Sequence, residues 1–288
     1  TRGCKPKATN FASPLVGSLK DPINYTRLDS MTTAADAPTN APAPGGSAPQ
    51  PVGIPKALAD FLFDLYDSVT TSQIPAEQQR LYKVEFPSLC QKYFGSSPWP
   101  SPPSVASECN GSPLFLSLYR ELTYRYACNN NSNANNNYYS RPTLHDRLEA
   151  WQVYQTLCDE ILEASSLYLV PQWTFDMLQE MLYQFQGYCQ LRSAVYASAR
   201  KQGLLVNNSL QPAAASTPQL QNLLENLQTL QSTSAWNVEQ VYDYLRRLMA
   251  LSGQGPSNTT GHYFKVFGSI VLSRLECLLA DYQGCLDA

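Results

Sequence analysis

The sequence predicts an all-α protein built of stacked antiparallel helices. Every periodic stretch of the chain places its apolar residues at helical spacing. No alternating apolar and polar pattern longer than four residues, the mark of a half-buried strand, occurs in the sequence. The stretch 172–201 has apolar residues over about half of a helix circumference, which is wider than the seam of a two-helix contact. A helix covered on two sides is typical of stacked helical repeats, because each unit packs on both of its neighbours.

Three polar stretches divide the chain into segments. Residues 1–55 hold nine of the 21 prolines, and their five Lys and Arg against three Asp and Glu give a net charge of +2. This composition cannot bury enough apolar area to offset the entropy of ordering, so we expect a disordered or extended arm. The predicted organisation is an arm at 1–55, an N-terminal helical domain at 56–201 with an Asn-rich insertion loop at 129–142, an insertion with one Leu-rich helix at 202–235, and the start of further helices at 236–288.

The first two helices are expected after Pro55, since proline favours the first turn of a helix. One face of the first helix carries Leu58, Phe61, Leu62, Leu65 and Val69. The second helix, over about 76–94, is expected to bend at Pro87, which lacks a backbone N–H, and to end at Gly95. Its expected apolar stripe is Leu81, Val84, Leu89 and Phe94.

The next two helices begin at clear N-terminal signals. Ser112 and Pro113 precede the third helix, and Thr143 with Asp146 has capping-box spacing before the fourth. The third helix has the apolar residues Leu114, Leu118, Leu122 and Tyr126. The fourth has Leu144, Leu148, Trp151, Cys158, Ile161 and Leu162.

The fifth helix, over about 172–201, has two adjoining apolar stripes. One consists of Leu178, Met181, Leu182, Phe185, Cys189 and Tyr196, and the other of Trp173, Met177, Tyr188, Leu191 and Val195. Tyr183 lies nearly opposite both stripes at 100° per residue. It is therefore either a scattered surface aromatic or a residue of an interface.

The last third of the chain continues the helical pattern. Thr217 and Pro218 precede a leucine stripe of Leu220, Leu223, Leu224, Leu227 and Leu230. A helix of this kind packs either on its own core or on a partner, which makes Leu220, Leu223 and Leu227 candidate interface residues. Asn237 and Gln240 have capping-box spacing before a helix containing Val238, Val241, Tyr242, Leu245 and Leu248. A helix over about 262–279 (Val266, Phe267, Ile270, Val271, Leu275, Leu278) is followed at 280–282 by a tight turn into one more helix.

The composition argues against several classes of function. Charged residues make up 15% of the chain and the net charge is −3, so a broad basic surface for nucleic acid is not expected. No run reaches the 18 or so apolar residues of a membrane span. Phosphate-loop and zinc-protease motifs are absent from the sequence. The two histidines, His145 and His262, fall in first helical turns, and no nucleophile elbow surrounds Cys128 or Cys158, so we expect no enzyme, no cofactor and no metal.

The eight cysteines leave two interpretations open. Their closest pair, Cys277 and Cys285, is too far apart for ordinary zinc-ligand spacing. Cys158 and Cys189 lie on apolar stripes, where cysteine behaves as a small buried hydrophobe. An even count and five Asn-X-Ser/Thr triplets keep a secreted, disulfide-bonded protein possible. The interpretation we favour is a reduced, cytoplasmic protein.

Several segments together resemble subunit L of eukaryotic translation initiation factor 3. The segments are collinear and cover most of 56–288: PWP at 98–100, LFLSLYRELTYRYA at 114–127, HDRLEAWQVYQTLCDEIL at 145–162, VPQWTFDMLQEMLYQFQGYCQLR at 170–192, WNV at 236–238 and HYFKVFGSIVLSRLECLLADYQGCLD at 262–287. The most specific parts are the pair Gln172-Trp173 and the run Tyr183-Gln184-Phe185-Gln186, with Gln190 and Arg192. The tracts at 129–137 and 202–235 depart from the family pattern and look like insertions.

The resemblance implies a scaffold and not a catalyst. It implies tetratricopeptide-like helical repeats, an α-solenoid, beginning at 236–288 and leading to a PCI module whose winged helix would lie beyond Ala288. It implies as partners subunits K, E and C of the factor and, through the complex, the small ribosomal subunit, with a role in preinitiation complex formation. The alternative is a helical scaffold of another PCI-type assembly, or a peptide-binding module of tetratricopeptide-like build.

Overall fold

The computed structural model describes most of the chain after the proline-rich arm, within one compact unit, Val52–Ala288. The described residues are 54–71, 74–94, 99–130, 142–164, 167–206, 209–210, 217–253 and 259–280. They are helical apart from one antiparallel hairpin of two-residue strands, β1 (Leu205–Val206) and β2 (Ser209–Leu210). The all-α prediction is therefore confirmed. The expected arm up to residue 53, most of the Asn-rich loop and the expected helix after Ala280 lie outside the described residues.

The first layer of the fold consists of short helices around α1 (Lys56–Thr70). All five residues of the predicted α1 stripe are buried, and Pro55 precedes the helix as its N-cap. The second predicted helix is divided into α2 (Pro75–Arg80), a π-helical turn (Leu81–Glu85) and α3 (Phe86–Tyr93). A short helix α4 (Pro102–Val105) and a 3-10 turn (Ala106–Cys109) complete this layer.

The π-helical turn corrects the prediction for Val84, whose side chain is 62% exposed. Within this turn the N–H of Phe86 donates to the carbonyl of Leu81, five residues back. The wider turn rotates the following residues away from the 100° register on which the predicted stripe depended. The deformation lies directly before Pro87, which has no N–H to continue the α-helical ladder. The helix thus deviates from α-helical geometry in a π-turn that precedes Pro87, where the bend was expected.

A buried glutamine is among the side chains that join the first layer to the rest of the protein. Gln78 of α2 is fully buried, and its Nε2 donates to the carbonyl oxygens of Ser68 (3.2 Å) and Tyr168 (2.9 Å). Its Oε1 accepts from the N–H of Val170 at 2.6 Å. Because every polar atom of this side chain has a partner, its burial carries no unpaired-group penalty.

Three long helices form the centre: α5 (Pro113–Asn130), α6 (Leu144–Glu163) and α7 (Pro171–Lys201). The capping box predicted at Thr143 and Asp146 is confirmed. The Thr143 Oγ1 accepts from the Asp146 N–H at 3.2 Å, and the Asp146 carboxylate accepts from the Thr143 N–H at 2.7 Å. Contacts between residues far apart in sequence, such as Arg120 with Glu149 and Tyr124 with Asp146, show that α5 and α6 run antiparallel.

The C-terminal part contains α8 (Pro218–Ser232), α9 (Val238–Ala250) and α10 (Thr259–Leu278). The side chain of Asn237 caps α9 as predicted, but it accepts from the N–H of Glu239 at 2.8 Å and not from that of Gln240. Helix α8 packs against α7, with Leu227 fully buried.

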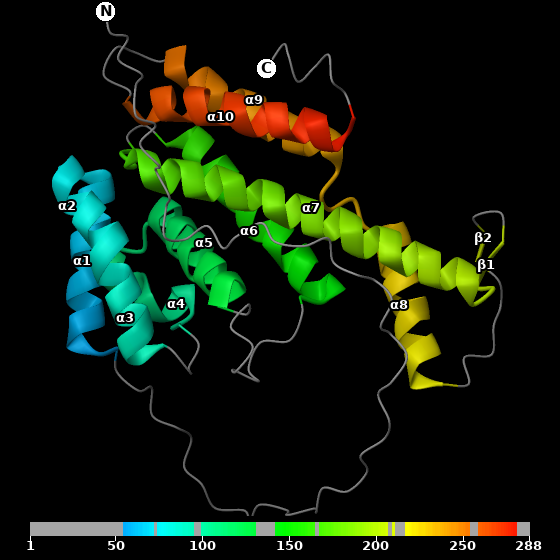
Figure 1. Ribbon diagram of the computed structural model, residues 1–288. Helices are drawn as coiled ribbons and strands as arrows, with labels where there is room; N and C mark the ends of the chain where they lie inside the picture. The colour runs from blue at the N-terminus through cyan, green and yellow to red at the C-terminus, as the bar shows by residue number, and fades with distance from the viewer. Residues whose placement is uncertain are drawn as a thin grey trace, which may run out of the picture. The chain divides into compact units, whose positions relative to one another are not determined.

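The helix pair α9–α10 stacks on the pair α6–α7, so that α10 lies beside α7 and α9 beside α6 (Figure 1). Helices α7 and α10 run parallel, because their contacts advance together along both: Leu169 with Thr260, Phe175 with Phe267 and Gln179 with Arg274. Helices α6 and α9 also run parallel, as the contacts of Arg147 with Trp236 and Asp159 with Tyr244 show. In a helical repeat, each helix runs parallel to the corresponding helix of the neighbouring pair, as is the case here.

Two groups of residues from the predicted apolar stripes are exposed. Cys189 is exposed although Cys158 is buried as predicted. Tyr188, Val195 and Ala199 are buried in the same part of α7, so the buried face of this helix beyond Gly187 is narrower than the two predicted stripes and leaves Cys189 out. On α10 the exposed members of the stripe are Val266, Ile270 and Leu278.

Candidate functional site

Of the residues considered for catalysis, His145, His262 and Cys158 have described side chains, and the side chain of Cys128 lies outside the described part of the chain. His145 and His262 are both exposed, on helices α6 and α10. Burial raises the pKa of the Cys158 thiol to about 12, so this sulfur stays protonated near neutral pH and is a poor nucleophile. Among the described residues no three His, Cys, Asp or Glu side chains are grouped as metal ligands. No described helix is long and apolar enough to cross a membrane.

A buried polar network joins α5, the π-turn and α7. Arg125 donates through Nε to Glu121 Oε1 at 2.8 Å and through Nη1 to the Tyr82 hydroxyl at 2.7 Å. The Tyr82 hydroxyl in turn donates to Asp176 at 2.8 Å, and its ring stacks on Trp173 with centroids 5.2 Å apart. Glu121 also accepts from a hydroxyl on α6, that of Tyr154, at 3.3 Å.

The electrostatics of this network favour a structural role. Burial raises the pKa of Tyr82 far above its usual range, so its hydroxyl remains a donor. Burial also raises the pKa of Glu180, which accepts from Gln184 Nε2 at 2.6 Å. Each of these groups has hydrogen-bond partners inside the fold. The network fixes the register of three helices against one another.

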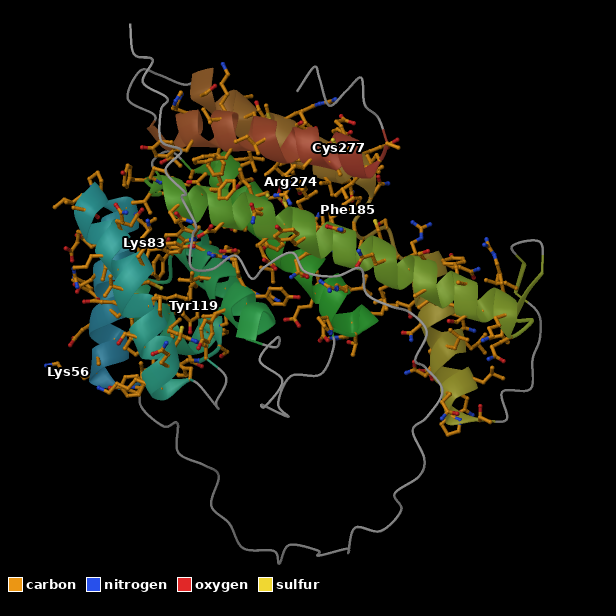
Figure 2. All side chains as sticks on the ribbon, viewed as in Figure 1. Lys56, Lys83, Tyr119, Phe185, Arg274 and Cys277 are labelled. Carbon is orange, nitrogen blue, oxygen red and sulfur yellow. The ribbon has the colours of Figure 1, made fainter. Side chains whose placement is uncertain are left out.

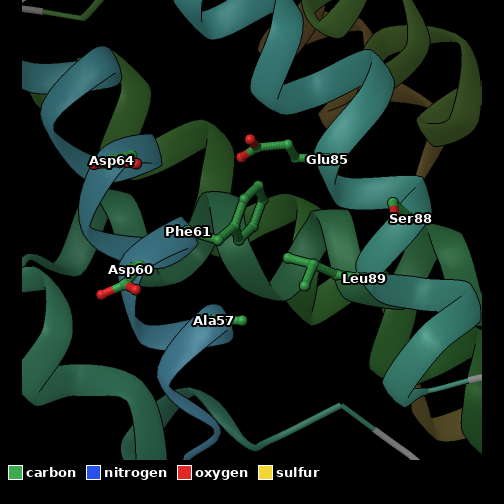
Figure 3. Close-up of a pocket in the computed structure, with 7 residues that line it drawn as sticks. All are labelled: Ala57, Asp60, Phe61, Asp64, Glu85, Ser88 and Leu89. Atoms are coloured by element: carbon green, nitrogen blue, oxygen red, sulfur yellow. The ribbon is translucent and has the colours of Figure 1, made fainter.

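An acidic groove lies between α1 and the helix formed by the π-turn and α3 (Figure 3). Its volume is about 350 Å³. The lining residues are Ala57, Asp60, Phe61, Asp64, Glu85, Ser88 and Leu89. Burial, followed by the nearby Glu85 and Glu77 carboxylates, raises the pKa of Asp64, while the positive charge of Arg80, which also pairs with Glu77 and Glu85, opposes this rise. Sequence reasoning missed this groove because it forms only where two separate helices meet. Its lining has no histidine and no cysteine.

The structure separates the predicted interface residues into three kinds. Leu227 is fully buried in the chain's own core, which means that it offers no surface to a partner. Leu220 and Leu223 are partly buried and pack against the same core. Tyr183 is 38% exposed, as its position opposite the apolar face predicts. The leucine helix therefore docks largely on its own core, and Tyr183 remains available.

Tyr183 has a neighbour that the sequence did not indicate. The guanidinium of Arg274 on α10 lies over the Tyr183 ring, 5.3 Å from its centroid, and Nη2 is 3.4 Å from the Tyr183 hydroxyl. Figure 2 shows Arg274 on the side of α10 that faces α7. Val266, Ile270 and Leu278 are exposed on the same helix. These residues from α7 and α10 form one continuous outer surface.

Comparison with known proteins shows what this chain is similar to. The family described as RNA polymerase I-associated factor PAF67 matches residues 146–288. Eukaryotic translation initiation factor 3 subunit L of Nematostella vectensis is 28% identical over 253 residues, covering 80% of this chain and 42% of that protein. The subunit L proteins of Xenopus tropicalis (29% over 230 residues, 72% of this chain and 36% of that protein) and Caenorhabditis elegans (27% over 257 residues, 81% and 43%) match similarly. The chain thus spans about two fifths of the length of the relatives it matches.

Proposed function

Because this chain is similar to subunit L of eukaryotic translation initiation factor 3, as its residues predicted, we propose that it acts as a non-catalytic structural subunit of that complex. In this role it supports assembly of the factor on the small ribosomal subunit and formation of the preinitiation complex. The observation that carries the proposal is the extent of the similarity, which covers 72% to 81% of this chain in proteins that share one name.

The architecture supports a role in binding other proteins. Two stacked helix pairs, α6–α7 and α9–α10, present long outer faces, and successive helical pairs of this kind build extended binding surfaces. Binding a partner on such a face needs no reactive side chain. The buried polar groups around Tyr82 and Arg125 are hydrogen-bonded to one another and so take a structural part in this role. We propose subunits K, E and C as neighbours, the small ribosomal subunit as the platform and the cytoplasm as the location.

Co-purification tests this function directly. The tagged full-length protein is expressed in cells of its source organism, and the eluate is analysed by mass spectrometry and by sedimentation through a sucrose gradient. We expect other factor 3 subunits in the eluate and a share of the tagged protein with small ribosomal subunits. An eluate without factor 3 subunits, from cells in which another tagged factor 3 subunit recovers the complex, would refute the proposal.

A further inference from the structure

Helix α10 carries an exposed ridge of side chains spaced four residues apart. Val266, Ile270 and Leu278 are 43%, 46% and 46% exposed, and Arg274 occupies the remaining position of the series. Side chains at this spacing form one continuous row on a helix surface, the row used in the commonest class of helix–helix packing. We call these four residues the α10 ridge.

The apolar members of the ridge are not scattered surface residues. Single exposed aliphatic side chains are normal on a protein surface, but a contiguous apolar row is typical of an interaction site. Leu279, 44% exposed, follows directly after the helix. Phe264, Val271 and Leu275 are buried in the fold, and Val266 and Ile270 lie on the side of α10 turned away from them, whereas Arg274 lies toward α7 and bonds to Gln179.

Among the described residues, the positive charge at the third position of the ridge has no carboxylate partner. Arg274 donates to Gln179 Oε1 at 3.2 Å and approaches the ring and hydroxyl of Tyr183, but no described carboxylate forms an ion pair with it. Tyr183 holds the guanidinium in place over its ring. Tyrosine and arginine are the residue types most enriched at the energetic centres of protein interfaces. A carboxylate from a partner would complete this site.

We propose that the α10 ridge, with Tyr183 at its edge, docks an amphipathic helix of another subunit of the complex. That helix presents aliphatic side chains at i, i+4 spacing to Val266, Ile270 and Leu278, and an Asp or Glu to Arg274. That the partner is a subunit of the complex rests on the proposed function. That it carries aliphatic and acidic side chains follows from the residues of the ridge. A second copy of this chain fits poorly, because a two-fold contact centred on the ridge would bring two unpaired Arg274 side chains together.

The test compares two substitutions that reverse the same charge on one helix. Arg274→Glu changes the ridge, and Lys265→Glu makes the matched change at an exposed position of α10 outside it. Ile270→Asp is a second ridge variant, and circular dichroism confirms that each variant is folded. Co-purification of factor 3 subunits with the tagged full-length protein should fall at least about tenfold for both ridge variants and stay within about twofold for Lys265→Glu, since one buried charge pair changes affinity by this order.

The outcomes separate this inference from the proposed function. If the wild-type protein recovers no factor 3 subunits, the proposed function fails. If the wild type recovers them and the ridge variants recover as much, the inference fails and the proposed function stands. The exposed thiol of Cys277 gives an independent readout, since it adjoins Leu278. Its alkylation by maleimide should slow at least about tenfold in the purified complex. Equal rates in the isolated chain and the complex, or a concentration-dependent dimer of the isolated chain, would overturn the inference.

Discussion

Replacing Arg125 by methionine should destabilise the protein far more than the same replacement at Arg247. Both arginines follow an acidic residue at i, i+4 spacing on a helix, so local helix geometry is matched. Glu121 and Arg125 have side-chain exposures of 0% and 9% and a contact of 2.8 Å, whereas Asp243 and Arg247 have exposures of 63% and 51% and a contact of 3.4 Å. The two pairs therefore differ chiefly in burial.

The expected magnitudes follow from what each substitution leaves behind. Arg125→Met leaves the Glu121 carboxylate buried without its cation and removes a donor from the Tyr82 hydroxyl. Breaking a buried pair in this way costs about 3–5 kcal/mol of unfolding free energy. Arg247→Met should cost at most about 0.5 kcal/mol, because water replaces the lost partner. In the double variant Glu121→Gln with Arg125→Met no charge is stranded at position 121, and the amide oxygen can still accept from Tyr154. Asp176, 3.9 Å from Arg125 Nη1, loses this cation equally in the single and the double variant.

Urea denaturation followed by circular dichroism and tryptophan fluorescence measures these differences, and Trp173 reports on the network because it stacks on Tyr82. We expect the double variant to be more stable than Arg125→Met alone by about 1–3 kcal/mol, the usual range of coupling between contacting residues. A loss below about 1 kcal/mol for Arg125→Met, or a double variant no more stable than the single one, would show that this pair is hydrated and that the network does not hold the helices together.

Three other predictions follow from burial. Phe185→Ala should reduce the unfolding free energy by about 3–5 kcal/mol, while Tyr183→Ala should change it by no more than about 0.5 kcal/mol; equal losses would show that the orientation of α7 is wrong. Burial raises the pKa of Glu180 above 4.5, so its stabilising protonation is complete below that pH and is lost as pH rises through the folded-state pKa. Glu180→Gln should therefore be stabilised relative to wild type at pH 7 but not at pH 4 in urea titrations, and a pH-independent difference would contradict this. Maleimide should modify Cys189 rapidly in the folded protein and Cys158 only after unfolding; comparable rates would place both thiols in solvent.

Local signals predicted the helices well where the chain's own core decides which face is buried. The capping box at Thr143 and the wide apolar face around Phe185 are both present because they depend on spacing within one helix. Val84 departs from its predicted position because the π-turn adds a residue to a helix turn, which a constant 100° rotation cannot represent. Cys189 departs because α7 buries a narrower face there, with Tyr188 and Val195 buried and Cys189 exposed, and the apolar pattern alone does not show how wide the covered face is.

The interface residues were harder to predict than the core for a related reason. The residues Val266 and Ile270 have the apolar character of core positions, and a helix that is apolar on most of its circumference does not reveal which side faces its own domain. Leu227 shows the converse. It belongs to a leucine stripe that looks suitable for a partner, but it is buried in the core of its own chain. The acidic groove at Asp64 and the contact of Arg274 with Tyr183 both join distant helices, so only tertiary structure could bring them together.

The small number of charged residues bears on both the buried polar network and the α10 ridge. Only 15% of the residues are charged, and the fold buries Glu121, Arg125 and Glu180 among them, which leaves still fewer charges to solvate the surface. A helix face in contact with water alone would be expected to carry such charges, as the outer face of α9 does with Asp243 and Arg247. Along the α10 ridge three of four positions are instead aliphatic and the fourth is an arginine without a described counterion. A partner of the proposed kind would supply both apolar cover for the aliphatic positions and a carboxylate for Arg274. This is favourable because exposing apolar side chains to water costs free energy, and burying an unpaired charge costs more.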